Sequence, residues 1–328
     1  MFSAATTAQY SRWWNRLAPL PTPGSPGNQQ WVSMATGNNV LVSVNQNTTT
    51  AGTRSTDGGV TWSAITLATN TYYSGVAANG ATFVAVSGTG YINYSTNSGA
   101  TWSSAGQPLG SNFSFSAIAY GAGVFVAIGS NFVSSNRQYA TSTNGSTWTV
   151  RTFPGSGGAG WSTITFGGGK FVTVGGGTWF TSTDGITWTS QTGGTAVNSL
   201  AYGSGYYVSA TYPDQVGYST DGLNWTSYTL TPTTGYIRTI GFGNGTFFIP
   251  ADPGGGASTT NFVYYATNPT ASGNWTLTTL PFTTSIYWVI APVYNTSSSA
   301  YSPDFAMLGY DAGNGGYATI SSDGITWY

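Results

Sequence analysis

Short apolar runs recur along the chain, and they are typical of β-strands that are buried on both faces. Residues 124–128 form one such run, and residues 115–120 before it alternate between apolar and polar side chains. Gly121 and Gly123 separate the two segments, as expected of a tight hairpin. Residues 138–142 and 147–151 follow as two further strands. This unit of about 40 residues therefore predicts four antiparallel strands.

The same unit is repeated through the whole chain. We expect the buried second strand of each unit at residues 40–44, 83–86, 125–128, 171–174, 207–210, 247–249 and 305–308. The first hairpin of six units contains a glycine, for which a positive φ costs little, and these are Gly37, Gly80, Gly121, Gly167, Gly203 and Gly243. The seventh unit has the longer segment 292–303 in place of a tight turn.

A short turn that ends in tryptophan marks each unit, and its best copies are residues 55–62 and 182–188. We call these the Trp-closed turns. They end at Trp62, Trp102, Trp148, Trp188, Trp225, Trp275 and Trp327, with spacings of 40, 46, 40, 37, 50 and 52 residues. Such a period indicates a repeat architecture, and four strands per unit indicate the blade of a β-propeller.

An Asp or Asn in each Trp-closed turn can accept hydrogen bonds from nearby backbone N–H groups, while the tryptophan packs between neighbouring blades. These residues are Asp57, Asn97, Asn144, Asp184, Asp221, Asn268 and Asp323. The Asn268 copy is stretched by residues 269–271, so we expect this hairpin to be the weakest.

The pattern Ser-x-Asp-x-Gly-x-Thr-Trp resembles the Asp-box, or BNR repeat, of β-propeller proteins. Sialidases, sorting receptors, a photosystem assembly factor and bacteriophage structural proteins carry it. The resemblance covers about residue 30 to residue 328 and implies an all-β fold, a seven-bladed β-propeller of four-stranded antiparallel blades. Residues 30–328 would form this single domain, and residues 1–29 an N-terminal arm. The Asp-box lies far from the functional sites of those families, so it implies little about function.

The last unit ends where its fourth strand should begin. Residues 12–20 resemble the fourth strands of the other units, so we expect them to pair with residues 316–321 and to complete the C-terminal blade. This pairing would close the propeller and remove an exposed edge. A disordered docking arm is the alternative.

The composition argues against several kinds of function. All eight acidic residues are Asp, and the chain contains seven Lys and Arg, with no Glu, His or Cys. Zinc and copper sites, and Ser-His-Asp or Cys-His nucleophiles, lack their usual residues, so we expect no metal and no cofactor. So few cations cannot neutralise a run of phosphates, which argues against nucleic acid. No apolar stretch reaches membrane-spanning length, and the N-terminus does not resemble a signal peptide.

Loop lengths vary most on the rim opposite the Trp-closed turns, where binding residues usually lie. Candidate ligand-binding residues on this rim are Phe113, Arg137, Trp161, Tyr212, Asp214 and Asp252. Aromatic and polar side chains of this kind suit sugar rings. The alternative interpretation is that these loops are only solvated surface.

A sialidase-like activity requires a glutamate and an arginine cluster, which this chain cannot assemble. Another glycoside hydrolase needs two paired carboxylates, and only Asp214, Asp252, Asp304 and Asp311 lie outside the Trp-closed turns. We therefore expect a non-enzymatic structural or adhesion protein of a virion, as a phage decoration, fibre or tail component released by lysis. Its partners would be other virion proteins and, in the adhesive form, a host-surface glycan. A cellular or secreted lectin-like propeller is the alternative, and a glycoside hydrolase is the less favoured one.

Overall fold

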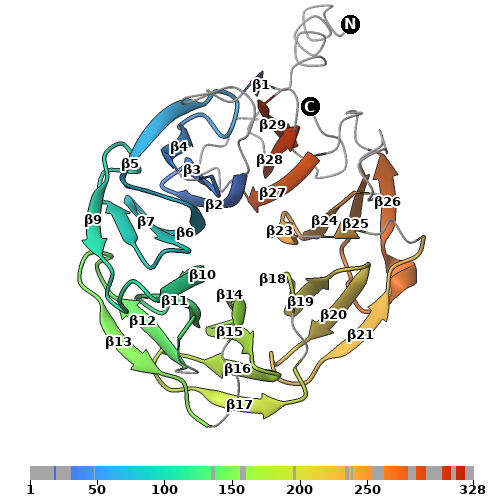
Figure 1. The fold of residues 1–328 in the computed structure, drawn as a ribbon. Helices are drawn as coiled ribbons and strands as arrows, with labels where there is room; N and C mark the ends of the chain where they lie inside the picture. The colour runs from blue at the N-terminus through green and yellow to red at the C-terminus, as the bar shows by residue number, and fades with distance from the viewer. Residues whose placement is uncertain are drawn as a thin grey trace, which may run out of the picture.

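The computed structural model describes residues 18–19, 31–47, 49–133, 137–155, 160–194, 197–232, 236–237, 239–252, 262–279, 286–292, 305–311 and 315–321. Strands in these ranges form seven antiparallel sheets, six with four strands and one with five. Figure 1 shows the sheets arranged radially about a common centre. The one helical element in these ranges is the short 3-10 helix η1 (Ser272–Asn274).

We number the sheets 1 to 7 in chain order. Sheet 1 comprises β2 (Trp31–Gly37), β3 (Val40–Asn45), β4 (Thr49–Ser55) and β5 (Ser63–Thr71). Sheet 2 comprises β6 (Tyr73–Asn79), β7 (Thr82–Ser87), β8 (Ile92–Ser95) and β9 (Ser103–Gly106). Sheet 3 comprises β10 (Phe113–Gly121), β11 (Val124–Asn131), β12 (Gln138–Ser142) and β13 (Thr149–Thr152). Sheet 4 comprises β14 (Trp161–Gly167), β15 (Lys170–Gly175), β16 (Thr178–Ser182) and β17 (Thr189–Thr192). Sheet 5 comprises β18 (Ser199–Gly203), β19 (Tyr206–Thr211), β20 (Gln215–Ser219) and β21 (Thr226–Thr229).

Sheets 6 and 7 depart from the simple four-stranded meander. Sheet 6 comprises β22 (Tyr236–Ile237), β23 (Gly241–Gly243), β24 (Thr246–Asp252), β25 (Phe262–Ala266) and β26 (Thr276–Thr279), and sheet 7 comprises β27 (Ile286–Pro292), β28 (Phe305–Asp311), β29 (Gly315–Ser321) and β1 (Ala18–Pro19). All seven predicted second strands are confirmed as β3, β7, β11, β15, β19, β24 and β28.

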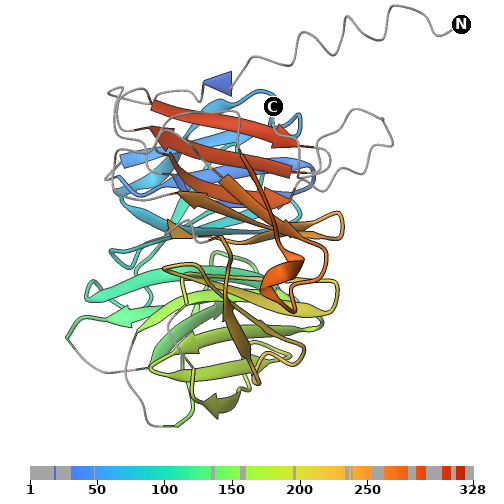
Figure 2. The same ribbon diagram turned by 90° about the vertical axis from the view of Figure 1, so that its right-hand side faces the viewer.

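Part of the N-terminal arm pairs with the last sheet. Ala18 lies opposite Ala318 and Pro19 opposite Tyr317 in an antiparallel pair of β1 with β29. Strand β27 contacts both β2 and β23, and sheet 7 (red) lies beside sheet 1 (blue) in both ribbon views (Figure 1, Figure 2). The remaining residues of the predicted 12–20 strand lie outside the described residues.

The hydrophobic cores lie between neighbouring sheets. Val42 of sheet 1, for example, belongs to one buried cluster with Tyr73 and Phe83 of sheet 2. The same arrangement joins sheets 2 and 3, 3 and 4, 4 and 5, and 5 and 6. Full burial of a side chain such as Phe83 stabilises the fold by about 1.5–3 kcal/mol. The second strands read as continuous apolar runs because both of their faces meet a core.

The glycines at the first hairpins have a different role from the one we expected. Of the six, Gly80 has a positive φ (56°), whereas the others are not in that region. Instead, an added Cβ at Gly121 would lie 2.0 Å from the ring of Phe166 in the next sheet, and one at Gly167 would lie 2.3 Å from Tyr202. These glycines leave room for an aromatic ring of the neighbouring sheet. The positive φ falls on the following residues, such as Gly123 at 80°.

The Trp-closed turns are hydrogen-bonded as the sequence predicts. In the first turn, Gly59 N donates to Ser55 Oγ (2.8 Å), and Thr61 N donates to Asp57 Oδ1 (2.8 Å). The indole of Trp62 donates to Gly59 O (2.8 Å). The equivalent backbone-to-side-chain bonds form at Asn97, Asn144, Asp184 and Asp221. Asp323 and Trp327 lie outside the described residues.

These turns also contact the preceding sheet. An added Cβ at Gly99, in the turn of sheet 2, would lie 2.6 Å from Val42 of sheet 1, and one at Gly145 would lie 2.7 Å from Val84. The ring of Trp102 packs on the core shared by sheets 1 and 2. The turns therefore join neighbouring sheets as well as closing their own hairpins.

The turn at Asn268 differs from the others. Ala266 stands where the other turns have serine, and Asn268 Oδ1 accepts a hydrogen bond from Thr270 N at 3.2 Å. The indole of Trp275 donates to the hydroxyl of Tyr228 in the preceding sheet (2.7 Å), as the indole of Trp188 does to Tyr139. Without the serine hydroxyl this turn loses the bond that holds the glycine N–H elsewhere. That it is the weakest hairpin stays a prediction.

Candidate functional site

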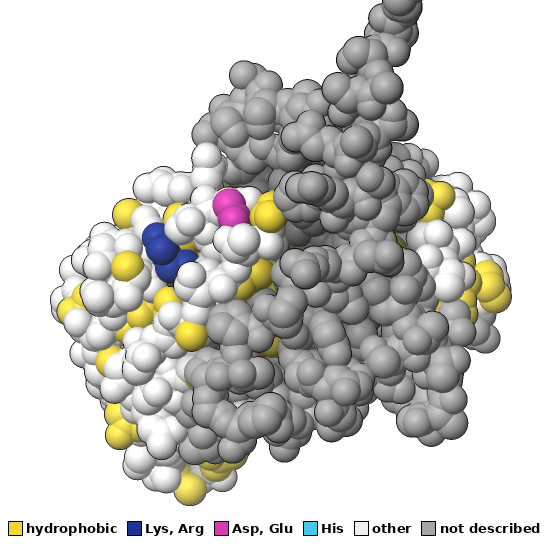
Figure 3. Space-filling model, turned by 90° about the horizontal axis from the view of Figure 1, so that it is seen from above, with side chains coloured by type: hydrophobic (Ala, Val, Ile, Leu, Met, Phe, Trp, Pro, Cys, Tyr) yellow, Lys and Arg dark blue, Asp and Glu magenta, His cyan; other side chains and the backbone are white. Residues whose placement is uncertain are grey.

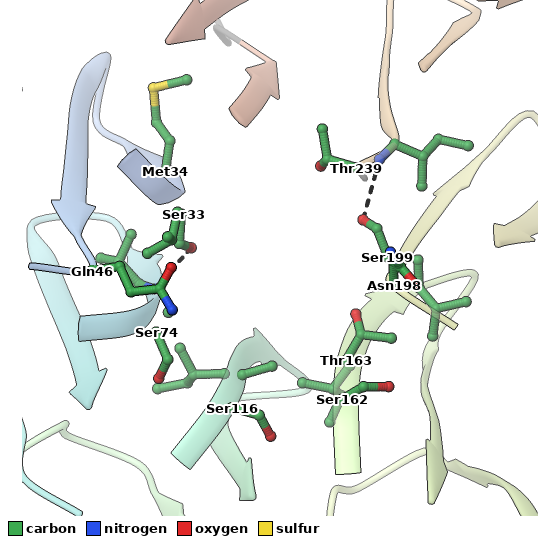
Figure 4. A pocket seen from close by; sticks show the side chains of 18 of the residues that line it. Ser33, Met34, Gln46, Ser74, Ser116, Ser162, Thr163, Asn198, Ser199 and Thr239 are labelled. Atoms are coloured by element: carbon green, nitrogen blue, oxygen red, sulfur yellow. Dashed lines mark hydrogen bonds between the residues drawn. The ribbon is translucent and has the colours of Figure 1, made fainter. Parts of the chain in front are cut away.

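A pocket of about 620 Å³ lies at the centre of the sheets. Its wall is built from the first strands β2, β6, β10, β14 and β18, and from Thr239 and Ile240 before β23. Figure 4 shows serine and threonine side chains around this wall, together with the amides of Gln46 and Asn198. The lining is polar and contains no charged residue among the described ones.

Serines at one repeated position of this wall join β6, β10 and β14 to the next sheet. Ser74 Oγ of β6 donates to Phe115 O of β10 (2.6 Å), and Ser116 Oγ of β10 donates to Trp161 O of β14. Ser162 Oγ donates to Val197 O (2.8 Å). The bonds all run from one sheet to the following one, so the hydroxyls stabilise the contact between sheets.

Ser33 and Ser199 lie one residue later in their strands, at the register position of Gly75, and act as acceptors. Val76 N donates to Ser33 Oγ (3.0 Å), and Ile240 N donates to Ser199 Oγ (3.2 Å). The sequence analysis missed these serines, although Ser74, Ser116 and Ser162 recur at spacings of 42 and 46 residues, within the range of the tryptophan spacings.

Local backbone irregularity aims Ser74 and Ser116 at the next sheet. The pairing of β6 with β7 skips Ser74, and that of β10 with β11 skips Ser116. A β-bulge of this kind turns one side chain away from its regular direction. The pocket is therefore a neutral, hydroxyl-lined cavity whose serines are engaged with the main chain. With no histidine in the sequence, no imidazole can activate them.

The two rims of the molecule differ in their connections. We call the side with the Trp-closed turns the turn rim, and the opposite side, with the connections between second and third strands and between sheets, the loop rim. Phe132 and Val133, between β11 and β12, are 70% and 71% exposed on the loop rim. Tyr212, between β19 and β20, is 51% exposed there. On the turn rim, Ile186 is 46% exposed.

The three aromatic candidate residues of the loop rim lie in two different environments. Phe113 and Trp161 are the first residues of β10 and β14, and both rings are buried in cores between sheets. They do not offer the rim surface that we expected, because the strands begin earlier than the loop pattern indicated. Tyr212 is exposed as expected.

The three charged candidates are also separated. Asp214 is buried, and its carbonyl accepts a hydrogen bond from Leu230 N (2.9 Å). Asp252 ends β24, and its side chain lies outside the described part of the structure. Arg137 is buried between sheets 3 and 4, against the aromatic rings of Trp161 and Phe180. The structure therefore brings Arg137 and Trp161 together and leaves Tyr212 on another sheet.

The Asp residues of the Trp-closed turns are held ionised by their turns. The backbone N–H of Thr187 has the largest effect on the pKa of Asp184; burial opposes it, and the N–H of Ile186 adds to it. The pKa of Asp184 consequently falls from 3.8 to about 2. Hydrogen bonding also outweighs burial at Asp57 and Asp221, where the pKa is lowered as well. These carboxylates accept the backbone hydrogen bonds that stabilise their own turns.

Among the described residues, no helix is long and apolar enough to cross a membrane. Within the same residues, no group of three or more acidic, histidine or cysteine side chains is placed to hold a metal ion.

Solved β-propeller structures are similar to this chain over nearly its whole length. YCF48 from Cyanidioschyzon merolae superposes with a TM-score of 0.61 at 14% identity, covering 93% of this chain and 99% of that chain. Virginiamycin B lyase from Staphylococcus aureus gives a TM-score of 0.66 at 12% identity, covering 93% and 97%. The WD40 propeller domain of Doa1 gives 0.57 at 12% identity, covering 93% and 94%.

Identities this low show the fold alone. The chain is an all-β protein with a β-propeller fold, and its structural neighbours include both a lyase and propellers with other roles. The sequence matches no protein-family model and no curated protein.

Proposed function

We propose that this chain is a non-enzymatic structural or adhesion protein of a virion, in which the loop rim contacts a glycan of the host surface. One observation carries the adhesive part of the proposal. Of the large apolar side chains that are well exposed in the described residues, Phe132, Val133 and Tyr212 lie on the loop rim. Exposed aromatic side chains on loops of a rigid scaffold are a common basis for binding.

The low charge of the surface favours a neutral ligand. Charged residues make up 5% of the chain. On the face in Figure 3, few of the described side chains are dark blue (Lys, Arg) or magenta (Asp, Glu). A neutral sugar is bound by hydrogen bonds and by stacking on aromatic rings, without ion pairs. Serine, threonine and asparagine on the loops supply the hydrogen-bonding groups.

The virion part of the proposal rests on the resemblance of the Trp-closed turns to the Asp-box of phage structural propellers. Two further features favour a role without catalysis. The serines of the central pocket are hydrogen-bonded to the main chain, as at Ser74 and Ser162. The Asp residues of the turns are likewise hydrogen-bonded within their own turns.

We also propose that the propeller has seven blades and is closed by the N-terminal arm. The seven sheets, the contact of β27 with β2, and the pairing of β1 with β29 support this arrangement. Closure through an N-terminal strand would tie both ends of the chain into one sheet and cover the edge of β29. It would also hold the loop rim rigid, as a binding surface requires.

A glycan array tests the adhesive role. We expect the wild-type chain to bind a host-surface glycan, and the double variant Phe132→Ser, Tyr212→Ser to bind it roughly tenfold more weakly, since an aromatic contact is worth about 1 kcal/mol or more. Ile186→Ser, which removes an exposed apolar side chain from the turn rim, is the matched control and should bind normally. Absence of glycan binding, or an equal loss in the control, would refute the proposal.

A further inference from the structure

Arg137 is a buried cation that has no carboxylate partner among the described residues. Its side chain is 7% exposed, just before β12 at the loop rim. Nη1 donates a hydrogen bond to Pro154 O (2.6 Å), whereas Nε is buried without any hydrogen-bond partner. Burial also lowers the pKa of the guanidinium, which nevertheless stays charged at neutral pH. An unpaired charge in this position is costly unless something neutralises it.

No acidic residue of this part of the chain can serve as the counter-ion. The sequence contains no Asp or Glu between Asp57 and Asp184, a stretch that includes every strand of sheets 2 and 3. Asp184 itself lies in a Trp-closed turn on the opposite rim, and its Oδ1 accepts hydrogen bonds from Ile186 N and Thr187 N. The counter-charge at Arg137 must therefore come from outside these sheets.

A second unpartnered donor lies beside the arginine. The indole Nε1 of Trp161 is buried without a hydrogen-bond partner, in a side chain that is 3% exposed. The guanidinium carbon of Arg137 lies 6.0 Å from the ring centre of Trp161 and 5.2 Å from that of Phe180. These rings stabilise the cation through their faces, but they leave both N–H groups without an acceptor.

The surroundings keep both donors in place. Trp161 is stacked on Phe153, with ring centres 3.9 Å apart and an interplanar angle of 18°. Phe153 N donates to Arg137 O (2.8 Å), which ties the connection after β13 to the start of β12. Pro154 and Gly155, which flank the guanidinium, are exposed, so the site lies directly beneath the surface of the loop rim. Two fixed donors and one positive charge match an acceptor that carries one negative charge.

We propose that Arg137 and Trp161 form a binding site for a small carboxylate, which enters from the loop rim between sheets 3 and 4. One carboxylate oxygen accepts from Arg137 Nε and the other from Trp161 Nε1, so that one ligand satisfies both donors and neutralises the arginine. The apolar rings of Phe153 and Phe180 favour a ligand with a short apolar tail. The site is separate from the exposed aromatic residues and does not depend on the adhesive function.

The test uses the full-length chain with sodium formate and sodium acetate, compared with sodium chloride at the same pH and ionic strength. A ligand that binds the folded state raises the melting temperature progressively with its concentration. We expect this rise with formate and acetate, together with a shift of the Trp161 indole N–H resonance, which the Trp161→Phe variant assigns. The indole of Trp31, in a pocket wall without charged residues, is the internal reference and should not shift.

Three variants locate the effect. Arg137→Gln should abolish the response, and Trp161→Phe, which keeps the ring and loses the donor, should weaken carboxylate binding about tenfold, the loss expected for one charge-assisted hydrogen bond. Arg151→Gln is the matched control, since Arg151 bonds Thr141 Oγ1 within sheet 3 (2.8 Å) and should leave the response unchanged.

Several results would overturn the proposal. Equal melting temperatures and resonances in formate, acetate and chloride would mean that water alone satisfies the two donors. A response that persists in Trp161→Phe at full strength would place the anion elsewhere, and this holds even if Arg137→Gln does not fold. A response to sodium sulfate without one to formate would refute the assignment to a carboxylate.

Discussion

The contact between a first-strand glycine and an aromatic ring of the next sheet leads to a quantitative prediction. Replacing Gly167 by alanine would place a Cβ 2.3 Å from Tyr202, and replacing Gly203 would place one 2.1 Å from Phe242. A Cβ atom essentially never lies within 3.0 Å of a non-bonded heavy atom, so the ring must move. Tyr202 cannot move freely, because its ring lies 4.7 Å from that of Tyr207, which is buried in the core shared by sheets 4 and 5.

The size of the effect follows from this overlap. Gly167 is not in the left-handed region of φ, so an alanine there adds no backbone strain and the cost arises from the clash alone. Forcing an extra methyl group into a packed core costs about 1–3 kcal/mol. For a chain of this length, this loss lowers the melting temperature by roughly 1.5–4 °C. We expect Gly167→Ala to show this loss in thermal or urea unfolding followed by tryptophan fluorescence.

Removing the ring of Tyr202 reverses the expected sign of the stability change that Gly167→Ala causes. In a Tyr202→Ala background the clash is absent, and Gly167→Ala should then stabilise by about 0.5–1 kcal/mol, because glycine in a strand costs that much relative to alanine. The difference between the two backgrounds measures the contact directly. Gly169→Asn is the control, since φ is 80° there, nothing lies within 4 Å, and Asn38 and Asn39 fill the equivalent turn of sheet 1. A neutral or stabilising Gly167→Ala in the wild-type chain would refute the reasoning.

Three further predictions concern other parts of the fold. Asp184→Ala should destabilise by about 1 kcal/mol and Asp184→Asn by less, since asparagine keeps the acceptor. The pKa of the Asp184 carboxylate is about 2 in the folded chain and 3.8 otherwise. Its contribution to the free energy of unfolding is therefore present above pH 4 and is lost as the pH falls towards 2. The acid unfolding of Asp184→Asn should depend less on pH in this window. Ser74→Ala should lower the unfolding free energy by about 0.5–1.5 kcal/mol and the exposed Ser190→Ala by almost nothing, as measured by urea unfolding. Deletion of residues 1–21 should lower the melting temperature, whereas deletion of residues 1–11, which spares the paired strand, should not; equal melting temperatures for the two deletions would contradict closure by the arm.

The strands could be predicted from the sequence because their signal is local. An apolar run such as residues 124–128 is buried on both faces, so its pattern is independent of which sheet lies beside it. The hydrogen bonds of the Trp-closed turns form within a few residues, which made the role of Asp57 visible without a structure. Because the unit repeats, the predictions of buried strands and of hydrogen-bonded turns could both be extended to the other units.

The features that the sequence analysis missed depend on contacts between sheets. Gly121 in the chain looks like a turn residue, and only the position of Phe166 in the next sheet explains why a Cβ is excluded. Ser74 reaches a carbonyl in β10 because a bulge redirects it. The recurrence of serine at residues 74, 116 and 162, at spacings close to the repeat length, was the available signal. For the bulge itself, the sequence offers no comparable pattern.

The candidate site was predictable only in part, for a similar reason. Arg137 and Trp161 were both identified as candidates, since each flanks a variable loop. That they lie together, and that two of their donors lack acceptors, follows from the packing of sheet 3 on sheet 4. Phe113 was misassigned to the rim because its strand begins inside the segment that reads as a loop.

The most direct measurement of the proposed function is mass spectrometry of purified virus particles from the lysate in which the protein is made. We expect its peptides to remain with the particles through gradient purification and high-salt washing, at a constant ratio to the major capsid protein. A chain found only in the soluble fraction, with particles that carry none of it, would contradict the virion assignment and favour the lectin-like alternative.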